Sequence, residues 1–407
     1  KSNIPQVEIP AHGEKWINIS REWPFAELWS PDTPRLYYLE LSVLENGKAI
    51  DAYRQRFGFR EFRIAGHRIL LNGYPIIHRR LSWSPKKRDP EGIKKEIEVL
   101  KKHGVTTIRI FYPNLIDRLA YLADETGLML CPTTAVGGGA GGKSDAFWKL
   151  YHDHIRAIVR ELQPHPSVAY WGVSNEFGTI YGTEGSPREQ TTTEKQVKAA
   201  RVFESCDPTR FWTAHGEIDL GYPVRNNVGP APVRSFHYPV PSNSSGKELP
   251  EIAYWYPDGK NAAWQRFNRK DKPLMISEDL YHGMTDQHLG MAKFAGDTTF
   301  SLDGYIKALR WAVRTFAAGY YLGGLSEWEP WCMYPDYPEN PLYRDFQLMP
   351  DYLIAIRGFF PNLYAGETDV RTLYVHNVRF TPQNCRLVKT IHLDGCRIGK
   401  EEVKFLL

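Results

Sequence analysis

Hydrophobic and polar residues follow two different periods along the chain, and the change between them divides it. Up to about residue 65 the runs have period two, as in 36–43 and 55–64, which is typical of strands with one exposed face. Glu45-Asn-Gly-Lys48 predicts a hairpin turn, and a further strand is expected over 16–19. We interpret residues 1–65 as part of a β-sandwich. Because such a domain usually needs ~100 residues, we expect its remaining strands upstream of this chain.

From about residue 69 short apolar runs alternate with segments of helical period. Asp89 as N-cap and Pro90 at the first position predict a helix that ends at His103-Gly104. Further helices are expected at 115–126, 144–162, 191–205, 260–268 and 304–318. Eight strands are predicted. The first follows a hairpin-like lead at 70–78, and the other seven are expected at 106–111, 128–131, 168–173, 210–214, 233–237, 273–277 and 321–326.

This alternation over ~250–300 residues predicts an α/β fold, a (β/α)8 TIM barrel. We assign residues 66–365 to the barrel. Residues 366–407 return to the strand period, in runs such as 372–375 and 388–393, and are expected to begin a further β domain.

Composition and charge narrow the function. The chain has 407 residues, of which 24% are charged and 42% hydrophobic. Its net charge is only +4 and its basic residues form no run, so the sequence lacks the basic patch that is typical of a nucleic-acid-binding protein. No apolar run is long enough to span a membrane. The five cysteines form no C-x-x-C motif, and neither a metal nor a cofactor is expected. Cellular location is not fixed by these features; a periplasmic or secreted protein is compatible with them.

Polar residues stand where the predicted barrel strands end. The buried run Val168 to Val173 ends in Ser-Asn175-Glu176, and the seventh strand ends in Glu278-Asp279. Because the carboxyl ends of barrel strands collect active-site residues, these two carboxylates are expected to face each other across the barrel mouth. Retaining glycosidases need two carboxyl groups ~5 Å apart. The other strand ends carry Arg109, His215, Glu217, His237, Tyr238, Glu327, Trp328 and Glu329.

Two other interpretations stay open on the residues alone. Gly137 to Ser144 matches the phosphate-loop pattern G-x-x-x-x-G-K-[ST], in which Lys143 would reach a nucleotide phosphate. Our preferred interpretation is a Gly-rich loop at the barrel mouth, with Ser144 capping the next helix. A carbohydrate-binding barrel with weak or no catalysis is the second alternative, and the retained carboxylate pair argues against it.

Several motifs resemble glycoside hydrolase family 2, which includes β-galactosidases, β-glucuronidases and β-mannosidases. Trp29-Ser-Pro and Phe57-Gly-Phe-Arg resemble the end of its immunoglobulin-like domain, and Leu71-Asn-Gly-Tyr-Pro-Ile resembles its entry into the barrel. His165-Pro-Ser-Val and Trp171-Gly-Val-Ser-Asn-Glu resemble its acid/base strand, the most specific of these motifs. The resemblance implies a retaining, exo-acting β-glycosidase, most similar to the β-galactosidases, with an oligo- or polysaccharide as its partner. Endo-acting and transglycosylating enzymes remain alternatives.

The resemblance also implies roles for single residues. Glu176 would be the general acid/base, Glu278 the nucleophile, and Asn175 the group that binds the sugar 2-hydroxyl. Arg109 and Tyr238 resemble the groups that hydrogen-bond the nucleophile, while His237 would bind substrate and Trp328 would form the floor of the sugar subsite.

The chain departs from the family at two places. The family often has Arg-Gly and a His- or Asn-bearing loop after the first barrel strand, where this chain has His78-Arg-Arg-Leu-Ser-Trp-Ser. Glu278 is followed by Asp-Leu-Tyr-His rather than Tyr-Gly. These segments border the site of the bound sugar, so they bear on which sugar is accepted.

Overall fold

The computed structural model describes residues 8–111, 116–134, 136, 144–175, 187–215, 231–237, 271–279, 317, 324–330, 351–357, 365–368, 370, 372–379 and 382–407. The helices predicted at 260–268 and 304–318 lie outside these residues, apart from Ala317.

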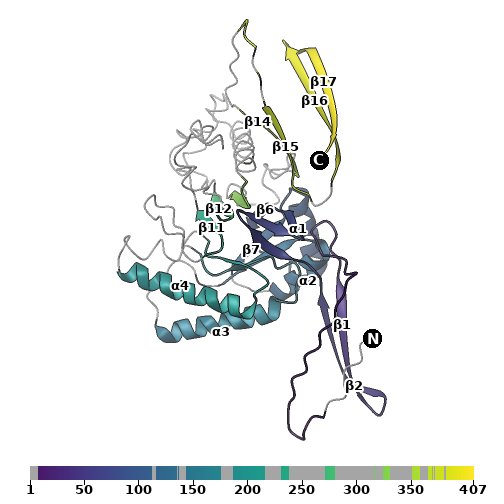
Figure 1. Cartoon of the computed structure of the whole chain (residues 1–407), viewed down its shortest axis with the longest axis vertical. Helices are drawn as coiled ribbons and strands as arrows, with labels where there is room; N and C mark the ends of the chain where they lie inside the picture. Colours follow the sequence, from purple (N-terminus) through teal and green to yellow (C-terminus); the bar gives the residue numbers. More distant parts are fainter. Residues whose placement is uncertain are drawn as a thin grey trace.

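The centre of the fold is a sheet of eight parallel strands (Figure 1). In chain order they are β6 (His78–Ser82), β7 (Thr107–Phe111), β8 (Met129–Thr133), β9 (Trp171–Gly172), β10 (Trp212–Thr213), β11 (Arg234–His237), β12 (Leu274–Asp279) and β13 (Glu327–Pro330). Each strand pairs with its neighbour in the chain except that β10 and β11 form the two ends, and the first strand pairs with the last. The predicted TIM barrel is confirmed.

Four helices connect the first five barrel strands: α1 (Pro90–Lys102), α2 (Ile116–Thr126), α3 (Asp145–Leu162) and α4 (Pro187–Cys206). The Asp89 side chain accepts the Gly92 amide at 2.7 Å and the Ser144 hydroxyl accepts the Phe147 amide at 3.3 Å, so both predicted N-caps are present. Helices α3 and α4 lie side by side outside the barrel (Figure 1). None of the helices in the described ranges is long and apolar enough to cross a membrane.

Alternation along the strands sorts side chains between two hydrophobic clusters. Ile108, Leu130, Trp171, Ile276 and Trp328 pack with the buried faces of the helices. The second cluster combines barrel residues with residues of a small sheet that precedes the barrel: Met129, Cys131, Tyr170 and Met275 meet Phe62, Ile69 and Leu71. Side chains on alternate strand positions therefore face either the helices or the barrel interior.

The segments flanking the barrel are antiparallel. β1 (Tyr37–Glu45) and β2 (Lys48–Phe57) form the predicted hairpin, and its turn residues Asn46 and Gly47 have φ of 50° and 79°, as a two-residue hairpin turn requires. At the other terminus β16 (Asn384–Leu393) pairs with β17 (Cys396–Leu406). In Figure 1 the two hairpins extend from the barrel in different directions.

Two small sheets cross the predicted domain boundaries. β3 (Phe62–Ala65) pairs with β4 (Arg68–Leu71), which pairs with β5 (Tyr74–Pro75). β14 (Tyr352–Arg357) pairs with β15 (Thr372–Asn377). The boundaries at 65/66 and 365/366 stay predictions.

Two predicted strands are wrong in place. Residues 16–19 are not a strand, and Trp16 is 90% exposed. Among the described residues no strand pairs with this run, and a period-two pattern forms a strand only where a neighbouring strand accepts its backbone hydrogen bonds. The last barrel strand begins at Glu327, whereas the described part of the predicted strand, 324–326, precedes it. The first barrel strand, predicted to follow the lead at 70–78, is the buried strand His78 to Ser82, so the segment that departs from the family's motif is the strand itself.

Candidate active site

Glu278 reaches the barrel mouth because β12 carries an irregularity. His237 of β11 pairs with Glu278 although Phe236 pairs with Ile276, and on the other side Asp279 pairs with Pro330 although Ile276 pairs with Trp328. Both registers leave one extra residue in β12, as at a β-bulge. With strict alternation, the Glu278 side chain would point the same way as Ile276, toward the helices and away from the barrel interior. The extra residue allows the side chains of Ser277 and Glu278 both to point inward.

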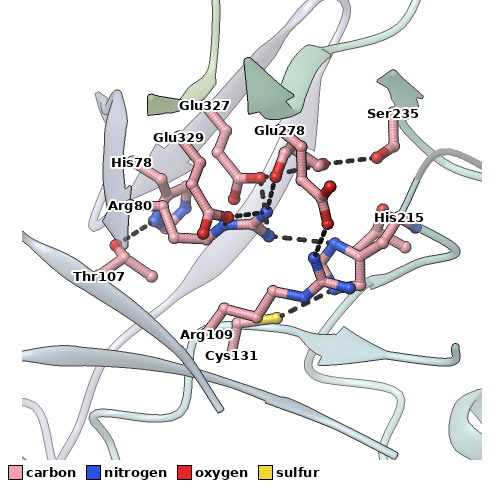
Figure 2. Close-up of polar contacts among 12 residues, drawn as sticks. His78, Arg80, Thr107, Arg109, Cys131, His215, Ser235, Glu278, Glu327 and Glu329 are labelled. Carbon is pink, nitrogen blue, oxygen red and sulfur yellow. Dashed lines mark hydrogen bonds and ion pairs between the residues drawn. The ribbon is translucent and has the colours of Figure 1, made fainter. Parts of the chain in front are cut away.

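Arg109 of β7 connects Glu278 to the end of the fourth barrel strand. Its Nη1 lies 3.3 Å from Glu278 Oε1, its Nη2 donates to Asn175 Oδ1 at 2.5 Å, and its Nε donates to Thr133 Oγ1 at 3.3 Å. The guanidinium carbon also lies 4.0 Å from the centre of the Phe111 ring. Figure 2 shows the Arg109 guanidinium pointing at the Glu278 carboxylate. The fork of one cation therefore holds a carboxylate and an amide in a fixed relation.

His237 contacts the second oxygen of the same carboxylate. Its Nδ1 lies 3.4 Å from Glu278 Oε2. Glu278 is 4% exposed, so its carboxylate is almost completely removed from water and held by two nitrogen groups. These contacts hold the carboxylate at a defined position.

A second cation, Arg80 of β6, lies at the centre of the barrel with no exposed surface. It donates from Nε to Glu329 Oε2 at 2.6 Å, and its Nη1 lies 3.0 Å from Glu327 Oε1. Glu329 also accepts the Ser82 amide at 2.7 Å, and Tyr170 donates its hydroxyl to Glu327. Arg80 Nη2 donates to the carbonyl of Ser277, the residue directly before Glu278, at 2.5 Å.

Burial and these charges shift several pKa values in the barrel centre. Burial raises the pKa of Glu327 to about 7, although Arg80 acts in the opposite direction. Burial lowers the pKa of His78 to about 3, and Arg80 adds to the effect. The pKa of His215 is held well below its ordinary value by burial and by the charges of Arg109 and Arg80. His215 and His78 are therefore neutral at pH 7.

The structure describes some of the predicted site residues and not others. Arg109, Asn175, His237 and Glu278 come together at the mouth. Glu176, Tyr238 and Glu217 lie outside the described residues, as do residues 137–143 of the Gly-rich loop. Among the described residues no group of three His, Cys, Asp or Glu side chains is arranged to hold a metal ion.

The assignment of Trp328 is corrected by the structure. Its side chain has no exposed surface and belongs to the cluster between barrel and helices, while Glu327 and Glu329 face Arg80. The physical reason is the period of two along β13, which directs Trp328 outward. The floor of a sugar subsite must be accessible to ligand, and Trp328 is not.

The sequence prediction missed the Arg80 cluster. Arg80 received no role in the first predicted strand, and Glu327 and Glu329 were placed at the end of the last strand without a partner. The signal was present: charged residues two apart in a short run, between apolar ones, as in Glu327-Trp-Glu329. Fully buried charges must be paired, so each such run predicts a partner of opposite charge inside the fold.

Comparisons with known proteins find similarities to glycosyl hydrolases. The model of the family "Glycosyl hydrolases family 2" matches residues 8–60. The chain is 30% identical over 180 residues to a β-galactosidase of Aeromonas hydrophila subsp. hydrophila, a match that covers 40% of this chain and 17% of the relative. It is 29% identical over 198 residues to a putative β-glucuronidase of Formosa agariphila, covering 45% of this chain and 23% of the relative. The matched segments thus span less than a quarter of either relative.

A solved structure extends the likeness over most of the chain. The β-D-mannosidase of Dictyoglomus thermophilum superimposes with a TM-score of 0.65 at 16% identity, covering 94% of this chain and 54% of that one. At this identity the superposition supports the fold: a barrel flanked by β domains. Taken with the sequence matches, it shows that the chain is similar to the glycosyl hydrolases of family 2 in sequence and in fold.

Proposed function

We propose that the protein is a retaining, exo-acting β-glycosidase in which Glu278 is the nucleophile and Glu176 the general acid/base. The observation that carries this proposal is the position of Glu278: a carboxylate at the barrel mouth, 4% exposed, held by Arg109 on one oxygen and His237 on the other. A nucleophilic carboxylate must be aimed at the anomeric carbon, and both contacts hold it in place. Asn175, directly before Glu176 in the chain, is joined to Glu278 through the same guanidinium.

The reaction proceeds in two displacements. Glu278 attacks the anomeric carbon while Glu176 donates its proton to the leaving glycosidic oxygen, which gives a glycosyl ester on Glu278. Glu176 then takes a proton from water, the water oxygen attacks the anomeric carbon, and Glu278 leaves as a carboxylate. Two inversions give net retention. In this proposal Asn175 binds the sugar 2-hydroxyl, and Tyr238 has the role of a further hydrogen-bond donor to the nucleophile.

The proposed substrate is a terminal β-linked sugar, with a β-galactoside first. Relatives of this chain are named β-galactosidase and β-glucuronidase, which supports a β-configured substrate. His78 to Ser82 and the residues after Glu278 differ from the family pattern, so a panel of nitrophenyl β-glycosides is the direct way to identify the sugar. Release of single sugars from the non-reducing end of an oligosaccharide distinguishes exo from endo action, and added alcohols as acceptors reveal transglycosylation.

Trapping with a 2-fluoro glycoside tests the mechanism. The fluorine slows both steps, so the glycosyl ester accumulates and peptide mass spectrometry locates it. A label on Glu278, together with retention of the anomer by NMR, is expected. A label on another residue or an inverted product contradicts the proposal. Sugar binding by the unmodified protein without turnover of any aryl β-glycoside would instead indicate a non-catalytic carbohydrate-binding barrel.

A further inference from the structure

The contacts of Arg80 determine which nitrogen of His215 carries the proton. Arg80 Nη1 lies 3.0 Å from His215 Nδ1 (Figure 2). A guanidinium can only donate, so His215 Nδ1 must accept. His215 is fully buried and its pKa is held well below the ordinary value, so the ring is neutral. Its single proton is therefore on Nε2.

The Nε2 proton of His215 has two acceptors on β8. Thr133 Oγ1 lies at 3.3 Å and Cys131 Sγ at 3.5 Å. Burial raises the pKa of the Cys131 thiol to about 12, so sulfur is neutral and a weak acceptor, and the Thr133 hydroxyl is the stronger one. The same Thr133 oxygen accepts Arg109 Nε at 3.3 Å. One hydroxyl oxygen thus joins His215 to Arg109.

We propose that Arg80 and His215 are positioning residues that, through Thr133, fix the Arg109 guanidinium between Glu278 and Asn175. This inference rests on the proposed function, since it assigns a purpose to Arg109 in that reaction. The order of contacts is Arg80 to His215, His215 to Thr133, and Arg109 to Thr133, with the fork of Arg109 directed at the reacting groups. Arg80 also holds the Ser277 carbonyl, so it fixes the nucleophile strand from the other side.

The backbone around His215 is shaped for this arrangement. His215 has φ of 47°, in the left-handed region that side chains with a Cβ rarely adopt, at the end of β10. Gly172 of β9 makes room for the ring: a Cβ there would lie 2.7 Å from His215 Nε2 and 2.4 Å from Thr133 Oγ1. A strained backbone and an obligatory glycine both serve the contact between His215 and Thr133.

The test replaces the shared hydroxyl. Thr133→Val keeps the branched shape and removes the acceptor, while Thr133→Ser keeps the hydroxyl. We expect Thr133→Val to lower kcat/KM on an aryl β-glycoside by roughly 10- to 100-fold, the range for loss of a hydrogen bond to a charged group, with Thr133→Ser restoring most of it. Thr107→Val is the matched control, because Thr107 is equally buried but bonds His78 at 2.8 Å away from this chain of contacts.

The readout specific to positioning is selectivity for the 2-hydroxyl. Because Asn175 is held by Arg109, displacing Arg109 should reduce the ratio of kcat/KM for the 2-hydroxy substrate to that for the 2-deoxy substrate. We expect this reduction in Thr133→Val and in His215→Leu. The double variant should be no more impaired than the worse of the two single variants. His215→Gln, whose amide can donate to Thr133, should recover part of the ratio. An unchanged ratio, or equal effects of Thr133→Val and Thr107→Val, overturns the proposal while leaving the glycosidase activity in place.

The tautomer gives a measurement that needs no turnover. Nitrogen-15 NMR of histidine-labelled protein, with His215→Gln to assign the signal, should show a neutral ring protonated on Nε2. A proton on Nδ1 rejects the proposal even if the enzyme is active. Failure of the wild type to hydrolyse any glycoside of the panel rejects the proposed function, and the NMR result still tests whether Arg80 orients His215.

Discussion

Glu278 and Arg109 meet at 3.3 Å from strands that are not neighbours in the barrel, β12 and β7. Neither residue has more than 5% of its side chain exposed. A contact across the interior of the barrel, rather than between paired strands, requires both side chains to point inward at the same level. For Arg109 this follows from strand alternation, and for Glu278 it follows from the extra residue in β12.

Arg109→Lys tests the importance of the guanidinium fork. The lysine keeps the charge, but a single ammonium cannot reproduce the directed bonds to Glu278, Asn175 and Thr133. We expect kcat/KM on the best nitrophenyl glycoside to fall by about 10- to 100-fold, equivalent to about 1.4–2.7 kcal/mol, and kcat/KM of Arg109→Met to fall further. Steady-state kinetics with circular dichroism as a folding check measures this. The exposed Arg54→Lys should match the wild type, and an equally active Arg109→Lys would show that the fork is dispensable.

Arg80→Met should be among the most destabilising single substitutions in the barrel. It leaves the fully buried Glu327 and Glu329 without their cation, which typically costs about 3–5 kcal/mol. The measurement is the free energy of unfolding from urea titration at pH 7. Arg54→Met is the matched control, because the Arg54–Glu40 pair has 61% and 68% exposed side chains and should contribute less than about 1 kcal/mol.

A compensating variant separates charge from packing in that cluster. Adding Glu327→Gln and Glu329→Gln to Arg80→Met removes the unpaired carboxylates, so much of the lost stability should return. If Arg80→Met lowers the free energy of unfolding no more than Arg54→Met does, or if the triple variant regains none of the lost stability, the ion cluster does not stabilise the barrel centre.

The overall fold could be predicted from the sequence because it depends on local patterns. The apolar faces of α1, α2 and α3 and the caps Asp89 and Ser144 are encoded within a few residues, and their alternation with strands specifies the barrel. Strand bounds were less accurate: β9 has only two residues in regular pairing, although Val168 to Val173 is uniformly apolar. Because every residue of such a buried run is apolar, the sequence does not show at which residue its pairing with the neighbouring strands begins.

The site could be predicted only in part, since it depends on register and on long-range pairing. Arg109 lies within the second barrel strand and Asn175 follows the fourth, as the order of apolar runs predicted, because position along a parallel strand suffices for that. The inward turn of Glu278 needs an extra residue in β12, and the outward turn of Trp328 needs the exact start of β13. Arg80 pairs with Glu329, which lies 249 positions further along the chain, and with Glu327 at a similar separation, so no local period records these contacts.

The raised pKa of Glu327 predicts a specific dependence of stability on pH. The unfolded carboxyl loses its proton at about pH 4.5, while in the folded barrel burial raises its pKa to about 7. Unfolding between these values releases a proton, so the free energy of unfolding contributed by Glu327 decreases as pH rises from 4.5 to 7. Compared with Glu327→Gln, the wild type should lose stability over this window and stay level above it.

His78 provides the control of opposite sign. Its pKa falls from 6.5 to about 3 on folding, because burial and Arg80 oppose the imidazolium. Unfolding therefore takes up a proton between pH 3 and 6.5, and the wild type should gain stability relative to His78→Gln as pH rises through that window. Urea titrations at about pH 4, 5.5 and 7.5 measure both differences, because these values sample the two pH windows. Parallel curves for Glu327→Gln and wild type would contradict the raised pKa.

Gly172→Ala tests how tightly the interior is packed beneath the proposed site. The added Cβ would lie 2.4 Å from Thr133 Oγ1, closer than real Cβ contacts allow, so Thr133 and the neighbouring His215 ring must move. We expect a loss of about 1–3 kcal/mol of stability from overpacking, and a larger proportional loss of kcat/KM than stability alone explains, because both displaced groups lead to Arg109. Gly399→Ala is the control: its Cβ would meet Ile391 at an ordinary 3.6 Å, so stability and activity should both be unchanged. A Gly172→Ala enzyme that is destabilised but fully active would show that Thr133 and His215 can shift without moving the groups at the barrel mouth.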